Sequence, residues 1–176
     1  MKQKRCKKCR KLKRETLFSL GKGGRNNTCR SCNYDGLTAT DKHKILREAY
    51  RNYLSWKDLL IYGGGSDSPV KDREALETIT HTVPKEPGSE EYIEISISFY
   101  DLERALKSFQ GEIQREGTVL SKRKEEAFYL NVIRDMLQRD VAQKMGITTV
   151  SVGQYVDQSM LQLVSYYFGE DNGATL

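Results

Sequence analysis

Four cysteines near the start of the chain have the spacing of metal ligands. They form two C-x-x-C pairs, Cys6 with Cys9 and Cys29 with Cys32, and nineteen residues separate the pairs. Two such pairs can place four sulfur atoms tetrahedrally around one Zn²⁺ ion, at about 2.3 Å, with no open position for water. A pair of disulfides is the competing arrangement, but the chain begins with charged residues and no apolar leader segment follows. We therefore expect one structural zinc ion and a reducing, cytoplasmic location.

The residues around these cysteines are strongly basic. Residues 1–36 contain twelve Lys or Arg against two acidic residues, a net charge of +10, so the other 140 residues sum to −5. A basic surface of this kind attracts polyanions. We expect residues 1–36 to form a zinc ribbon that contacts nucleic acid or an acidic protein surface, and simple structural support is the alternative.

The cysteine-containing segment is also similar to a zinc element that is common in phage proteins and precedes some HNH nucleases. Nuclease chemistry would need a His-Asn-His constellation and a metal-bound water. The chain has only two histidines, His43 and His81, and neither lies in such a context. We therefore expect a binding and folding unit and no enzyme activity.

A second group of residues, Arg139 to Tyr155, has the pattern of a helix-turn-helix with two short helices. Ala142 is small where the second helix would cross above it, and Gly146 stands where a helix C-terminus commonly needs a left-handed residue. Thr148 can then cap the second helix by accepting a backbone N–H. The other inward-facing positions of the motif are expected to be Val141, Met145, Ile147, Val152 and Tyr155.

The inward-facing positions leave a polar set of residues exposed at the start of the second helix. In this motif such positions reach base edges in the major groove, while nearby cations contact phosphates. The candidate DNA-binding residues are Arg123, Arg139, Lys144, Thr148, Thr149, Val150, Ser151 and Gln154. A helical core with no nucleic-acid role is the alternative. Residues 121–163 carry six Lys or Arg against five acidic residues, so we expect this motif to bind DNA weakly by itself.

Residues 98–169 resemble region four of bacterial sigma factors. The resemblance rests on Asp101-Leu102-Glu103-Arg104-Ala105-Leu106, on Leu120-Ser121-Lys122-Arg123-Lys124-Glu125-Glu126, and on Arg139-Asp140-Val141-Ala142-Gln143-Lys144-Met145-Gly146-Ile147-Thr148. It implies a promoter-reading module that docks on bacterial RNA polymerase. Many members of the family carry Arg late in the recognition helix where this chain has Gln154, and glutamine favours adenine over guanine.

Polar residues mark where the helices of this region should begin. Ser98, Ser121 and Thr148 are the expected N-caps. Residues 111–119, GEIQREGTV, contain two glycines and mixed charge, so they predict an inserted loop where sigma factors have a tight turn.

The middle of the chain predicts one helix and two linkers. Residues 41–62 have apolar residues at helical spacing and predict a single amphipathic helix. The Gly- and Pro-containing segments 63–69 and 83–91 predict flexible connections, and residues 92–98 alternate like a short strand or extended arm. No apolar run is long enough to span a membrane.

The expected fold is therefore mainly α, with a small zinc ribbon, an amphipathic helix and a C-terminal helix-turn-helix domain. The expected divisions are 1–36, 37–62, 63–97, 98–169 and a tail at 170–176. We expect a sigma-like, sequence-specific transcription factor whose partners are double-stranded DNA and bacterial RNA polymerase core. The alternatives are a polymerase-independent repressor, which would usually dimerise, a ring-forming phage DNA-packaging adaptor and, less favoured, a zinc-containing nuclease.

Overall fold

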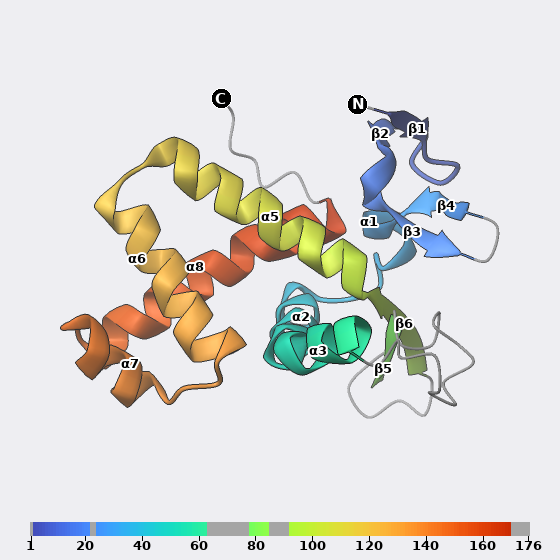
Figure 1. The fold of residues 1–176 in the computed structure, drawn as a ribbon. Coiled ribbons are helices and arrows are strands. Elements are labelled where there is room, and N and C mark those ends of the chain that lie inside the picture. The colour runs from blue at the N-terminus through green and yellow to red at the C-terminus, as the bar shows by residue number, and fades with distance from the viewer. Residues whose placement is uncertain (1, 22–23, 63–77, 85–91, 170–176) are drawn as a thin grey trace.

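The protein is mainly helical, with a small cysteine-containing unit packed at one end of the helices (Figure 1). The computed structural model describes residues 2–21, 24–62, 78–84 and 92–169. This architecture confirms the expected order of a small metal-binding unit followed by helices. None of the helices in the described part of the chain is both long enough and apolar enough to span a membrane.

The N-terminal unit consists of two short antiparallel hairpins and one helical turn. Strand β1 (Gln3–Arg5) pairs with β2 (Leu12–Arg14), and β3 (Phe18–Gly21) pairs with β4 (Gly24–Cys29) after the 3-10 turn η1 (Glu15–Leu17). Helix α1 (Arg30–Asn33) follows β4 directly. The small apolar cluster of this unit consists of Cys6, Phe18 and Cys29. A core this small needs another source of stability, and a bound metal can supply it.

The single helix expected over residues 41–62 is two helices in the structure. Helix α2 (Ala39–Arg51) begins with a capping box formed by Thr38 and Asp41, and α3 (Tyr53–Tyr62) follows after Asn52. The Asn52 side-chain amide donates to the Glu48 carbonyl at 3.0 Å. The Asn52 backbone N–H also donates to this carbonyl at 3.3 Å, so the backbone and the side chain of Asn52 together cap the end of α2.

Residues 92–98 form a strand, as expected, but they have a partner that the sequence pattern did not predict. Strand β6 (Tyr92–Ser98) pairs antiparallel with β5 (Thr78–Pro84), from Thr78 opposite Ser98 to Pro84 opposite Tyr92. The first two residues of the linker expected at 83–91 therefore belong to β5. Residues 85–91 and the linker expected at 63–69 lie outside the described residues.

The inserted loop expected at residues 111–119 is much shorter in the structure, because residues 111–116 are the end of a long helix. Helix α5 (Phe99–Glu116) runs through Gly111 and ends at Gly117, whose φ of +62° is the left-handed conformation. Gly111 is tolerated because it faces open space, while Phe109 and Ile113 on either side are buried and continue the apolar stripe. Packing of this stripe outweighs the glycine's helix-interior cost of about 1 kcal/mol.

The last part of the chain contains three more helices and one π-helical turn. They are α6 (Val119–Phe128), η2 (Tyr129–Ile133), α7 (Gln138–Met145) and α8 (Thr149–Phe168). Thr148 caps α8, as expected. The N-cap of α6 is Thr118 and not Ser121, which is buried in the first turn and donates its N–H to Thr118. Ser98 holds the N-cap position of α5, but its side chain makes no capping hydrogen bond.

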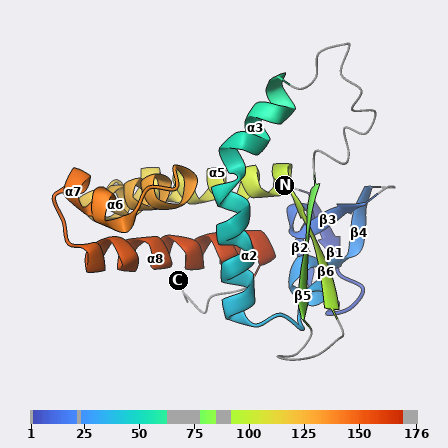
Figure 2. The same ribbon diagram turned by 90° about the horizontal axis from the view of Figure 1, so that it is seen from below.

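Helix α8 is the centre of the hydrophobic core. It contacts α1, α2, α5, α6 and α7, and α2 crosses it on one side (Figure 2). Its buried residues include Val152, Val156, Met160, Leu163 and Phe168. The second helix of the motif is therefore long, with 20 residues, and not short as the sequence pattern predicted. The first half of α8 is the second helix of the helix-turn-helix, and its second half contacts the N-terminal unit.

Candidate metal centre and nucleic-acid interface

The four cysteines of the chain converge in the N-terminal unit. One sulfur atom from each of Cys6, Cys9, Cys29 and Cys32 lies within 4.8 Å of the others, and the Cys9 and Cys29 Sγ atoms are 4.0 Å apart. Tetrahedral coordination with metal–sulfur bonds of about 2.3 Å requires sulfur atoms roughly 3.8 Å apart. The four residues are therefore close enough to hold one metal ion.

Local backbone structure places each pair of sulfurs. The first pair lies on the turn between β1 and β2, where Cys6 accepts the Arg10 N–H at 2.9 Å and donates its own N–H to Lys11 at 3.0 Å. Arg10 has a φ of +58°, so this tight turn uses a left-handed residue that is not glycine. The second pair brackets the end of β4 and the first turn of α1, so Cys32 is presented by a helix.

The surroundings shift the pKa values of two cysteine thiols in opposite directions. Burial by itself would raise the pKa of Cys6, but backbone N–H donors from Cys29, Cys9 and Lys8 outweigh it and lower that pKa to about 6. Burial and the neighbouring sulfurs raise the pKa of Cys32 to about 12. Four thiolates this close repel one another, and a bound cation would offset that repulsion and favour their ionisation.

A buried ion pair fixes the N-terminal unit to the helices. Arg30, from α1, lies 2.7 Å from the Asp101 carboxylate on α5, and the two side chains are 3% and 1% exposed. Arg30 also donates to the Tyr167 carbonyl and lies over the Tyr167 ring, 4.5 Å from its centroid. This role of Arg30 could not be predicted from the sequence, because no local pattern links a residue between two cysteines to the start of a distant helix.

The turn of the helix-turn-helix has the expected geometry. Gly146 has a φ of +64°, and the Ile147 N–H donates to the Ala142 carbonyl at 3.0 Å. Thr148 accepts the Ser151 N–H at 3.1 Å. Val141 and Ala142 are buried, and α7, which carries them, contacts α8.

The start of α8 presents a mostly polar surface to solvent. Val150 is 68% exposed, Thr148, Thr149 and Gln154 are also exposed, and Ser151 is half-buried. Gly153 is not part of this surface. It faces α7, because a Cβ atom at this position would lie 3.8 Å from the Gln138 side chain. The exposed surface therefore consists of residues 148–151 and 154, with the glycine turned toward the preceding helix.

The cations expected to contact phosphates lie on two helices next to α8. Arg139 and Lys144 are exposed at the two ends of α7, and the Arg139 side chain is 80% exposed beside Asp140, with a separation of 3.3 Å. Arg123 is exposed on α6. All three side chains can reach solvent, and α6 and α7 both contact α8.

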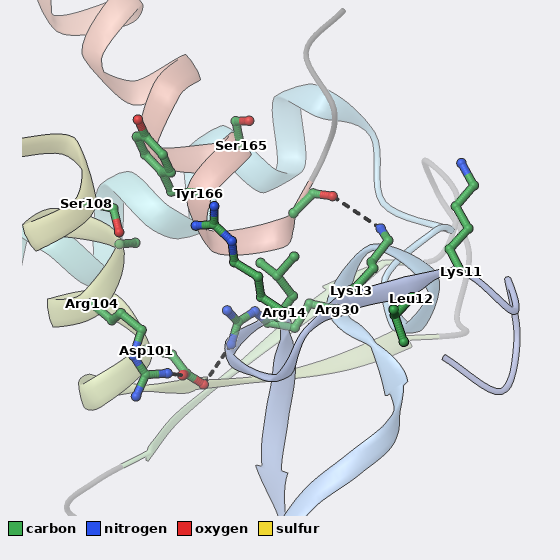
Figure 3. A pocket seen from close by; sticks show the side chains of 13 residues that line it. Lys11, Leu12, Lys13, Arg14, Arg30, Asp101, Arg104, Ser108, Ser165 and Tyr166 are labelled. Carbon is green, nitrogen blue, oxygen red and sulfur yellow. Dashed lines mark hydrogen bonds and ion pairs between the residues drawn. The ribbon is translucent and has the colours of Figure 1, made fainter. Parts of the chain in front are cut away.

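A cavity that no sequence pattern predicted lies where the N-terminal unit meets α5 and the end of α8 (Figure 3). Its volume is about 390 Å³. Its polar lining residues are Lys11, Lys13, Arg14, Arg30, Asp101, Arg104, Ser108, Ser165 and Tyr166. The cavity is basic because three elements that are distant in the sequence each contribute cations to it.

No family of known proteins, no curated protein and no solved structure matches this chain. The four cysteines form one candidate site, and the exposed start of α8 forms a second one. They lie toward opposite ends of the molecule, because α8 has 20 residues and a helix of that length spans about 30 Å.

Proposed function

We propose that this protein is a sequence-specific DNA-binding transcription factor of the sigma-like type. It would read promoter DNA through the start of α8 and dock on bacterial RNA polymerase. The observation that supports this proposal best is the surface at Thr149, Val150 and Gln154. These side chains are exposed beside a tight turn, while Val152 and Val156 on the opposite side of the same helix are fully buried.

Each exposed residue offers a contact that suits a base edge. The Gln154 amide can both donate to and accept from adenine, and the Val150 and Thr149 methyl groups can contact the methyl group of thymine. Ser151 can pair with several bases. Arg139 and Lys144 on α7 and Arg123 on α6 would bind phosphates, which fixes the register of the helix but carries no sequence information.

The N-terminal unit would hold one Zn²⁺ ion through Cys6, Cys9, Cys29 and Cys32. Four thiolates make a closed, tetrahedral site of the structural kind, and bound zinc would contribute folding free energy directly. A stable unit would keep Arg30 in place against Asp101 and Tyr167. The metal would thereby support the far end of the helix that reads DNA.

Weak intrinsic DNA binding fits a factor that acts as part of a larger complex. Residues 121–163 are nearly neutral, with six basic and five acidic side chains, so phosphate attraction adds little affinity. Tethering to a second partner would raise the effective concentration at the promoter. The assignment of that partner as RNA polymerase rests on the resemblance of residues 98–169 to region four of sigma factors.

Selection of binding sites from random duplex DNA tests the base-reading role. The zinc-loaded protein is selected with and without RNA polymerase core, beside the Gln154→Ala variant. Loss of the amide should relax the preference at one or two base pairs by about 1–3 kcal/mol. Gln114→Ala is the matched control, because Gln114 is an exposed glutamine on α5. An unchanged preference in Gln154→Ala would show that α8 does not read DNA as proposed.

A further inference from the structure

The cavity between the N-terminal unit and the helices has an excess of positive charge. Among the described residues, five Lys or Arg line it, against one carboxylate, that of Asp101. A hollow lined by charges of one sign concentrates ligands of the opposite sign. We propose that this cavity binds a phosphate group, and this inference does not depend on the proposed DNA-reading role of α8.

The one carboxylate among the lining residues that the structure describes is already paired. Asp101 lies 2.7 Å from Arg30 and 3.2 Å from Arg104, so these three residues together carry one positive charge. The Lys13 amine donates to the Ser31 hydroxyl and to the Gly169 carbonyl. Both acceptors are neutral, so the charge of Lys13 is not offset. An entering anion would therefore meet positive charge and no unpaired carboxylate among the lining residues.

Arg14 is the residue best placed to meet the ligand. It is exposed on β2, and Figure 3 shows its side chain directed into the cavity toward Tyr166 of α8. It makes no ion pair with any residue that the structure describes. The planar guanidinium can donate two parallel hydrogen bonds to the oxygens of a phosphate. Arg14 would therefore supply both charge and orientation.

Hydroxyl groups line the wall opposite β2. Ser108 lies on α5, and Ser165 and Tyr166 lie on the last turns of α8. Hydroxyl groups and cations can together donate several hydrogen bonds to the oxygens of one phosphate group. The volume of about 390 Å³ falls within the range of about 300–1,000 Å³ that small-ligand pockets have.

A phosphate group could reach this cavity from two sources. One is the backbone of a nucleic acid, and the other is a free phosphate or nucleotide. Gln154 and Tyr166 are 12 residues apart on α8, about 18 Å at 1.5 Å per residue, so a DNA phosphate in the cavity would not belong to the base pair that Gln154 reads. The chemistry of recognition is the same in both cases.

Calorimetric titration of the zinc-loaded full chain with inorganic phosphate tests the site, at constant ionic strength. Wild-type protein should bind phosphate, and Arg14→Gln and Arg104→Gln should each weaken binding about tenfold, because each removes a charged donor. Arg115→Gln removes the same charge from the exposed end of α5 and should bind like the wild type. Circular dichroism confirms that each variant is folded.

A second arm uses a short duplex of arbitrary sequence and follows the dependence of its affinity on salt. If the source is a nucleic-acid backbone, Arg14→Gln should reduce the slope of log affinity against log salt by about 1. If the slope is unchanged while phosphate binding is lost, the site takes a free phosphate or nucleotide. The proposal is wrong if wild-type protein does not bind phosphate, or if Arg14→Gln, Arg104→Gln and Arg115→Gln all bind it equally.

Discussion

The ion pair between Arg30 and Asp101 can be tested by removing one charge while keeping the size of the side chain. Asp101→Asn leaves the Arg30 guanidinium buried, with its side chain only 3% exposed, and without its carboxylate. At 2.7 Å the attraction between the two charges is roughly 6 kcal/mol at an effective dielectric constant of about 20. Breaking a buried pair costs about 3–5 kcal/mol. We expect a loss of about 3 kcal/mol, since the asparagine oxygen can still accept a hydrogen bond.

Urea unfolding in the presence of zinc, followed by circular dichroism, measures this loss. The matched control is Glu103→Gln on the same helix, where Glu103 pairs with Lys107 at 3.2 Å and the Lys107 side chain is 70% exposed. An exposed pair of this kind contributes about 0.3–0.5 kcal/mol. If Asp101→Asn destabilised the protein no more than Glu103→Gln does, the anchoring of the N-terminal unit through Arg30 would be refuted.

Three further predictions concern stability. Gly153→Ala should raise the free energy of unfolding by about 0.5–1 kcal/mol, because the new Cβ would make an ordinary 3.8 Å contact with Gln138; a lower urea midpoint would contradict this. Chelation of the metal should lower the Tm, and added Zn²⁺ should restore it, whereas an unchanged Tm would exclude a structural metal. Burial, partly opposed by Asp157, lowers the pKa of His43 in the folded protein. Below about pH 6.5 the unfolded chain therefore binds more protons than the folded protein, so the free energy of unfolding should decrease as the pH drops through that value. His43→Gln should remove that component of the pH dependence, as urea midpoints at several pH values would show.

Features set by neighbouring residues could be predicted from the sequence. Gly146 and Thr148 mark the turn before α8 because a left-handed residue and an N-cap are local requirements. The spacing of the cysteines likewise indicated one cluster of four sulfurs. In both cases the residues that define the feature are close together or share one chemical role.

Features set by distant contacts could not be predicted. Gly111 looked like part of a loop, but buried Phe109 and Ile113 keep that segment helical. The cavity exists because β2, α5 and α8 meet, and no sequence pattern near Arg14 indicates which helices it will face.

The central proposal is that this protein is a sigma-like factor, and RNA polymerase tests it most directly. Purified, zinc-loaded protein is mixed with bacterial core polymerase, the complex is isolated, and transcription start sites are mapped on DNA from the neighbouring genome. Stable binding that produces new start sites, weakened by Gln154→Ala and not by Gln114→Ala, is the expected result. Absence of polymerase binding, together with tight and salt-sensitive DNA binding by the protein alone, would contradict it.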